Sequence, residues 1–144
     1  MKKILIACIT GCLFLASPAM ARDDRHKFSL DELMKTDKAK QALYDIPLYF
    51  ADQSFPKPLR KQTGITTNKK TNAFGKSDKE ACEWAFLSAI KALQERAEKE
   101  GMNAVVNIKS NYKHNEFSSR TEFECGAGNV IAGVALKADI VKLP

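Results

Sequence analysis

Residues 77–101 read SDKEACEWAFLSAIKALQERAEKEG and predict a long amphipathic helix. Ser77 and Glu80 have the spacing of a capping box, in which the Ser oxygen accepts a first-turn N–H and the Glu reaches back to the cap. Gly101 supplies the left-handed residue that ends many helices. Apolar and small side chains recur at three- and four-residue spacing and form one stripe: Cys82, Ala85, Phe86, Ala89, Ile90, Leu93 and Ala97. Alanines in this stripe allow another layer to approach closely, so we expect a sheet under the helix. The opposite face is charged, with Lys79, Glu83, Lys91, Glu95, Glu98 and Lys99.

The first 21 residues have the features of a secretory signal peptide. Lys2-Lys3 precede an apolar run, Ile4–Ala16, and Ala19-Met20-Ala21 is a small-residue cleavage site. We therefore expect export, to the periplasm or beyond the cell. The apolar run is shorter than the ~20 residues that a spanning helix needs, so no membrane span is expected. Ile9-Thr10-Gly11-Cys12 is similar to a lipobox, but the apolar run continues past Cys12, which disfavours lipidation.

Cleavage after residue 21 of 144 would leave 123 residues, enough for one modest core. Removing Lys2-Lys3 from 23 basic residues leaves 21 against 17 acidic ones, a mild excess that is no nucleic-acid signature. We divide the chain into a signal peptide (1–21), an N-terminal arm with short helices (22–46) and an α+β core (47–144).

Two cysteines, Cys82 and Cys125, remain after cleavage. An even count in an exported protein predicts a disulfide, and the alternative is a pair of buried free thiols. The bridge would close a loop of 43 residues, for which chain entropy gives about 4 kcal/mol of stabilisation.

Before the long helix, the pattern is broken. Arg22–Lys27 is polar, and we expect it to be disordered. Phe28–Tyr44 contains two N-cap signals, at Ser29 and at Thr36, which predict two short helices or one kinked helix. Leu48–Phe50 predicts a short strand, and Thr63–Asn68 a second short or edge strand.

After the long helix, the pattern becomes extended. Asn103–Tyr112, Phe117–Cys125 and Asn129–Leu143 predict strands, and short turns between them make consecutive strands antiparallel. Gly133 indicates a bulge or a close backbone approach. The predicted fold is α+β: one long helix on a three- to five-stranded antiparallel sheet, with short N-terminal helices and one disulfide.

The candidate anion-binding residues are Lys69, Lys70, Lys76 and Ser77, which surround the start of the long helix. Gly75-Lys76-Ser77 is similar to the end of a phosphate-binding loop, but Lys70 stands where that loop needs its first glycine. No nucleotide site is therefore expected. The alternative to an anion site is a solvated basic loop.

Catalytic and metal signals are weak. His26 and His114 are the two histidines, and neither has a ligand partner at metal spacing, so neither a metal nor another cofactor is expected. The chain lacks a Gly-x-Ser-x-Gly elbow, and no catalytic residue is assigned. Glu122 and Glu124, on one strand face, and His114 are the side chains that a hydrolase could use.

From Tyr49 onward the chain resembles a family of small exported proteobacterial proteins of unknown function. The segments that carry this resemblance cover about two thirds of the chain: Tyr49–Gln53, Asn68–Phe74, Ala81–Ala89, Leu93–Ala97, Gly101–Asn107 and Thr121–Cys125. Members are often labelled an excinuclease ATPase subunit. This chain is far too short for such an ATPase and lacks its nucleotide loop, so neither ATPase nor nuclease activity is expected.

The junction of Gly101 with Asn103–Val106 is also similar to the helix–strand junction of YbjQ-like domains and of the Rcs outer-membrane lipoprotein sensor. These resemblances imply an α+β fold and a link to envelope stress. The hypothesis from sequence is a non-catalytic exported module that binds a protein or an anionic ligand. The alternatives are a small cell-envelope hydrolase and a secreted effector.

Overall fold

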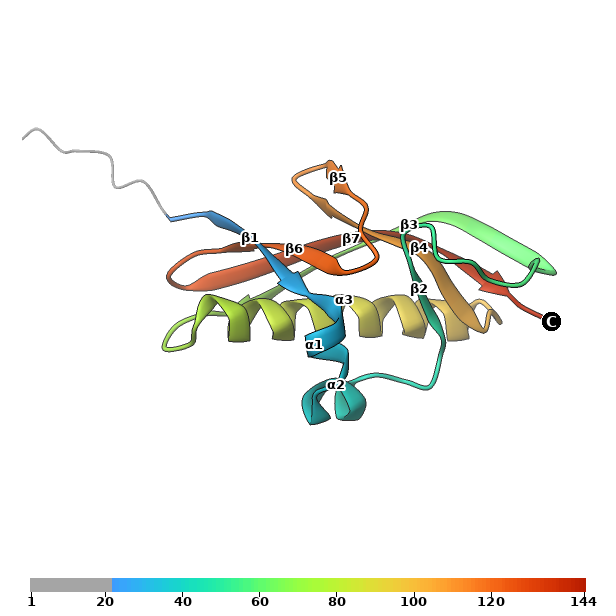
Figure 1. Ribbon diagram of the computed structural model, residues 1–144, viewed down its shortest axis with the longest axis horizontal. Coiled ribbons are helices and arrows are strands. Elements are labelled where there is room, and N and C mark those ends of the chain that lie inside the picture. Colours follow the sequence, from blue (N-terminus) through green and yellow to red (C-terminus); the bar gives the residue numbers. More distant parts are fainter. Residues whose placement is uncertain (1–21) are drawn as a thin grey trace, which may run out of the picture.

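The structure, a computed structural model, describes residues 22–144 (Figure 1). The predicted signal peptide and Cys12 lie outside the described residues. Within them, no helix is long and apolar enough to cross a membrane. The elements in chain order are β1 (Asp24–Ser29), α1 (Leu30–Met34), α2 (Asp37–Ala42), β2 (Leu48–Phe50), β3 (Arg60–Asn72), α3 (Asp78–Lys99), β4 (Ala104–Tyr112), β5 (Asn115–Phe117), β6 (Glu122–Ala127) and β7 (Ile131–Lys142).

The fold is α+β, with a mixed sheet of seven strands. The main path is β1-β6-β7-β4-β2, while β3 pairs with β7 and β5 with β4. β2 runs parallel to β4, and the other pairs are antiparallel. The prediction of a three- to five-stranded antiparallel sheet is therefore wrong in size and in direction. The short-turn rule covers only consecutive strands, whereas β3 and α3 separate β2 from β4 along the chain.

β1 overlaps the segment Arg22–Lys27, for which the sequence predicts disorder, so that prediction is wrong. It pairs along its whole length with β6 of the predicted core. Its outward cations lie over aromatic rings, Arg25 at 5.3 Å from the ring centre of Tyr112 and Lys27 at 4.1 Å from that of Phe117. Cation–π contacts and backbone pairing thus order a segment with little apolar content.

The predicted strand Phe117–Cys125 is divided in the structure. Residues 115–117 form β5 beside β4, and the chain returns to the sheet only at β6. Ser119 causes the break, because its Oγ accepts the N–H groups of Thr121 (3.1 Å) and Glu122 (3.0 Å) and closes a local turn.

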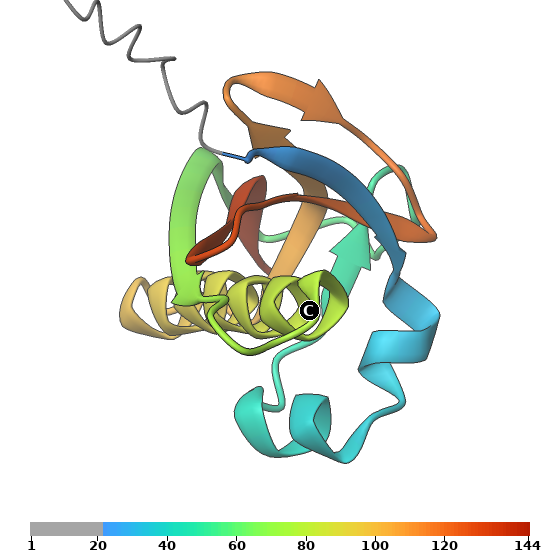
Figure 2. The same cartoon turned by 90° about the vertical axis from the view of Figure 1, so that its left-hand side faces the viewer.

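α3 covers one face of the sheet, as both views show (Figures 1 and 2). Ser77 caps it, with the Glu80 N–H donating to Ser77 Oγ at 3.1 Å, and Gly101 follows with φ of +71°. The predicted stripe is fully buried. It packs on side chains of alternate β7 residues, including Val134, Leu136 and Ile140. Ser29 and Thr36 cap α1 and α2, which confirms two short helices.

Two polar side chains of α3 are buried and hold the N-terminal arm. Glu83, predicted on the charged face, is 8% exposed and lies 3.2 Å from the Lys38 ammonium. Gln94 donates to the carbonyls of Tyr44 and Ile46 and accepts the Tyr44 N–H, each at 3.0 Å. These contacts fix the connection between α2 and β2 on the helix.

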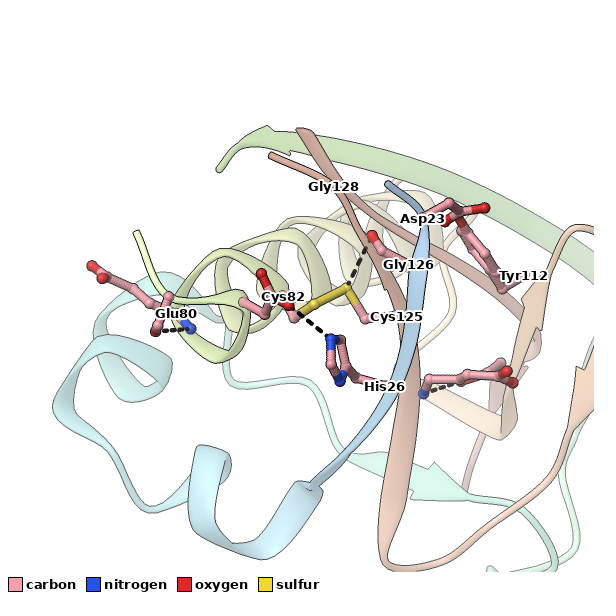
Figure 3. The surroundings of a disulfide bond; sticks show 12 residues. Asp23, His26, Glu80, Cys82, Tyr112, Cys125, Gly126 and Gly128 are labelled. Atoms are coloured by element: carbon pink, nitrogen blue, oxygen red, sulfur yellow. Dashed lines mark hydrogen bonds and ion pairs between the residues drawn. A yellow bond between two sulfur atoms is a disulfide. The ribbon is translucent and has the colours of Figure 1, made fainter. Parts of the chain in front are cut away.

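The predicted disulfide between Cys82 and Cys125 is confirmed. It joins the first turns of α3 to β6 across 5.8 Å between Cα atoms, and both residues are fully buried. His26 of β1 lies opposite Cys125 in the register and beside the bridge (Figure 3). Three segments distant in the chain therefore meet at this point.

Candidate functional site

A candidate site is a hollow on the face of the sheet that does not carry α3. Its volume is about 590 Å³, and residues of β3, β4, β6 and β7 line it. Gly126 and Gly133 face each other in the register of β6 and β7 and form its floor. Tyr112, at the end of β4, lines the hollow and lies over Gly126.

The two floor glycines differ in what surrounds them. A Cβ atom at Gly126 would overlap the hydroxyl end of Tyr112, whereas one at Gly133 would meet Lys70 Cγ at an ordinary 3.7 Å. The β3–β7 register is continuous at Gly133, so the predicted bulge is absent there. The tight approach belongs to Gly126, a position that strand alternation alone does not single out.

A chain of polar contacts fixes the Tyr112 ring. Its hydroxyl donates to Asp23 Oδ1 at 2.9 Å, and the other Asp23 oxygen binds the Lys113 ammonium. Arg25 lies over the ring and pairs with Glu124 at 3.1 Å. Burial, followed by the hydrogen bond to Asp23, raises the pKa of Tyr112, while Lys113 and then Tyr112 lower the pKa of Asp23. Tyr112 thus stays a protonated donor.

The lining of the hollow is basic. Arg22, Lys70, Lys113 and His114 contribute to it, against one carboxylate, Asp23. Arg22 and Lys113 each have a carboxylate partner. Lys70 has no such partner within residues 22–144, so its charge is available to a ligand.

The four predicted anion-binding residues do not meet at one point. Lys69 and Lys70 are neighbours on β3, so their side chains point to opposite faces, and only Lys70 lines the hollow. Lys76 donates to the Asn72 carbonyl at 3.0 Å in the turn before α3, and Ser77 is occupied as the N-cap. The structure therefore places Lys70 in a different site from the helix start.

The start of α3 already holds ion pairs. Arg22 binds both oxygens of Asp78 at 2.9 and 3.0 Å, and His26 Nε2 lies 2.8 Å from Asp78 Oδ2. The Arg22 hydrogen bonds, helped by His26 and opposed by burial, lower the pKa of Asp78 to about 2.

With Asp24, these residues form a cluster that sequence spacing could not show, because Asp78 lies 52 positions from His26. Ligand atoms of Asp24, His26 and Asp78 lie within 4.8 Å of one another, a set that could hold a metal ion. The Arg22 guanidinium binds both carboxylates, at 2.7 Å from Asp24, and so supplies a cation to this cluster.

The candidate hydrolase residues are spread over the molecule. His114 lines the hollow, Glu124 is buried beneath Arg25, and Glu122 is exposed at the start of β6. Neither glutamate lines the hollow. The arrangement gives His114 no carboxylate partner among the described residues.

Comparison with known protein families, with curated protein sequences and with solved structures finds no match for this chain. The resemblances described for the sequence therefore stay predictions.

Proposed function

We propose that the protein is a non-catalytic binding module, working outside the cytoplasm, that takes an anionic ligand with an apolar body into the hollow. The observation that carries the proposal is Lys70, a lining cation without a carboxylate partner in the described chain, beside a floor of two glycines. The volume of about 590 Å³ lies within the range of about 300–1,000 Å³ that is typical of small-molecule sites.

The lining defines the chemistry of the ligand. Gly126 and Gly133 add no side chains to the lining, and the Tyr112 ring lies over Gly126, so a flat body can approach the sheet beside that ring. The Tyr112 ring offers an aromatic face at the side, held in place by Asp23 and Arg25. Lys70 then attracts the negative group at the β3 rim. A flat apolar body with one negative charge fits these features.

Binding is favoured over hydrolysis because acid–base catalysis needs paired groups within hydrogen-bond reach. Of the candidate residues only His114 lines the hollow, and the lining carboxylate, Asp23, is already bound by Tyr112 and Lys113. The buried Cys82–Cys125 disulfide supports an oxidising compartment, in agreement with the predicted signal peptide. Cell fractionation distinguishes a periplasmic protein from a secreted effector, and the link to envelope stress rests on the sequence resemblance alone.

The proposal is tested with naphthalene-2-sulfonate, an anionic aromatic probe, and with uncharged naphthalene-2-methanol. In an NMR titration, the largest changes in backbone amide chemical shift should be at Gly126 and Gly133 and their neighbours. The affinity for the sulfonate should depend on Lys70, whereas the affinity for the uncharged alcohol should not. Lys70→Ala should weaken sulfonate binding by about fivefold or more, as expected for loss of a charged contact.

Lys69→Ala is the matched control, because it removes the same charge from the same strand on the opposite face. Equal weakening by both substitutions, or shifts centred outside the hollow, would contradict the proposed site.

A further inference from the structure

One end of the molecule presents large apolar side chains to solvent. Phe74, in the turn between β3 and α3, is 77% exposed, while Val130 and Ile131, at the β6–β7 hairpin, are 61% and 52% exposed. The Ala73 N–H donates to the Val130 carbonyl at 2.7 Å, which joins the two loops. Figure 2 views the molecule from this end, with the turn and the hairpin in front. Phe74, Val130 and Ile131 are named the apolar tip.

The exposure of Phe74 is built into an ordered turn. Its N–H donates to Asn72 Oδ1 at 2.9 Å, and the Lys76 N–H donates to the Ala73 carbonyl at 3.1 Å. Gly75 takes a φ of +73°, which completes the turn. These hydrogen bonds order the backbone of the turn, and the Phe74 side chain stays exposed in the folded protein.

Positive charge lies directly behind the apolar tip. Lys70 and Lys76 have no carboxylate partner in residues 22–144, and the Lys76 ammonium donates to the Asn72 carbonyl. Of the nearby carboxylates, Asp24 and Asp78 are already bound by Arg22, and Glu80 in the first turn of α3 is exposed without an ion pair among residues 22–144. An apolar projection backed by free cations is the result.

We propose that the apolar tip docks the protein on an anionic lipid bilayer. Phe74, Val130 and Ile131 would enter the boundary between headgroups and acyl chains, while Lys70 and Lys76 approach the lipid phosphates. Apolar side chains with basic neighbours are the features of proteins that lie on a membrane, and aromatic rings are enriched at that depth.

The shape of the tip favours a bilayer over a protein partner. A stable protein interface covers about 800 Å² on each partner with complementary packing. Three side chains projecting from two loop ends offer little such surface, whereas a fluid bilayer accepts them without complementary shape. Phe74 and Val130 do not line the hollow, so docking and ligand binding can be tested separately.

The test measures cosedimentation with vesicles of phosphatidylglycerol and of phosphatidylcholine. The protein is expressed with its predicted signal peptide and purified after export, and intact-mass analysis determines where the purified chain begins. The wild type should bind phosphatidylglycerol vesicles, less tightly at high salt, and phosphatidylcholine weakly. Phe74→Ser should weaken binding by about tenfold or more, as expected for one large apolar side chain.

Leu59→Ser is the matched control. Leu59 is 69% exposed and lies at the opposite end of β3, where its N–H donates to the Lys142 carbonyl. Leu59→Ser should bind vesicles like the wild type. Absence of binding to phosphatidylglycerol, or equal weakening by Phe74→Ser and Leu59→Ser, would overturn the proposal. The proposal would also be overturned if the wild type does not bind vesicles but self-associates, and if Phe74→Ser abolishes that self-association.

A second readout locates the contact. Trp84 is the single tryptophan, so Phe74→Trp in a Trp84→Phe chain carries one reporter at the tip. Its emission should shift to shorter wavelength when vesicles bind. An unchanged emission from vesicle-bound protein would show that another surface meets the lipid. Naphthalene-2-sulfonate binding should stay unchanged in Phe74→Ser, so each proposal can fail alone.

Discussion

Alanine at the two floor glycines should change stability by different amounts, although the glycines face each other across one strand pair. A Cβ at Gly126 overlaps the Tyr112 hydroxyl group, while a Cβ at Gly133 has its nearest contact at 3.7 Å. Neither glycine has a left-handed φ, so backbone strain does not enter the comparison. The difference between the two substitutions therefore isolates the packing of Tyr112.

The magnitude follows from the displaced contacts. Forcing extra volume into a packed site costs about 1–3 kcal/mol, and losing the Tyr112–Asp23 hydrogen bond adds about 1–2 kcal/mol. Alanine in place of glycine within a strand recovers about 0.5–1 kcal/mol. Gly126→Ala should therefore lower the free energy of unfolding by about 1–4 kcal/mol, whereas Gly133→Ala should leave it unchanged or raise it by about 0.5 kcal/mol.

Urea denaturation followed by circular dichroism measures both variants against the wild type. Spectrophotometric titration adds a second test, because a displaced Tyr112 loses the burial and the Asp23 contact that raise its pKa. The pKa of Tyr112 should thus move toward its ordinary value in Gly126→Ala and not in Gly133→Ala. Equal stability changes in the two variants would refute the assignment of Gly126 as the tight position.

Further predictions concern the framework around the site. Replacing Cys82 and Cys125 together by alanine should lower the free energy of unfolding by about 4 kcal/mol in urea, as loop closure over 43 residues requires. Because Arg22 holds the pKa of Asp78 at about 2, below its unfolded value of 3.8, this pair stabilises the fold above pH 4. That contribution is lost as the pH falls from 4 to 2. The free energy of unfolding of Asp78→Asn should therefore fall less than that of the wild type over this pH interval, as measured by denaturation at each pH. Gln94→Leu should cost about 2–3 kcal/mol in thermal unfolding, because the backbone groups it binds lose their partners in a buried setting.

The helix and its cap could be predicted because their signals are local. Ser77, Gly101 and the apolar stripe act within a few residues, and the structure confirms each. The size of the sheet could not be predicted, because β1 is ordered by contacts with residues far along the chain. Arg25 and Lys27 look solvated until Tyr112 and Phe117 come beneath them.

The candidate site shows the same limit. The sequence predicts Lys70 as an anion-binding residue but groups it with Lys69 and Lys76, because the three are close together along the chain. Strand alternation sends Lys69 to the other face, a separation that follows only once β3 extends through both residues. Gly126 gives no sequence signal of its own, because its role depends on a tyrosine from another strand.

Alternation along β6 and β7 divides structural from binding roles in this fold. On β6, Phe123 and Cys125 face α3 in the core, while Gly126 faces the hollow. On β7, Val134 belongs to the core, and Gly133 beside it belongs to the floor. Because each strand serves both faces, a one-residue register shift would place a glycine under α3 and a large side chain in the hollow. Anchoring β6 to α3 through Cys125 blocks such a shift, so the disulfide preserves the hollow as well as the stability of the core.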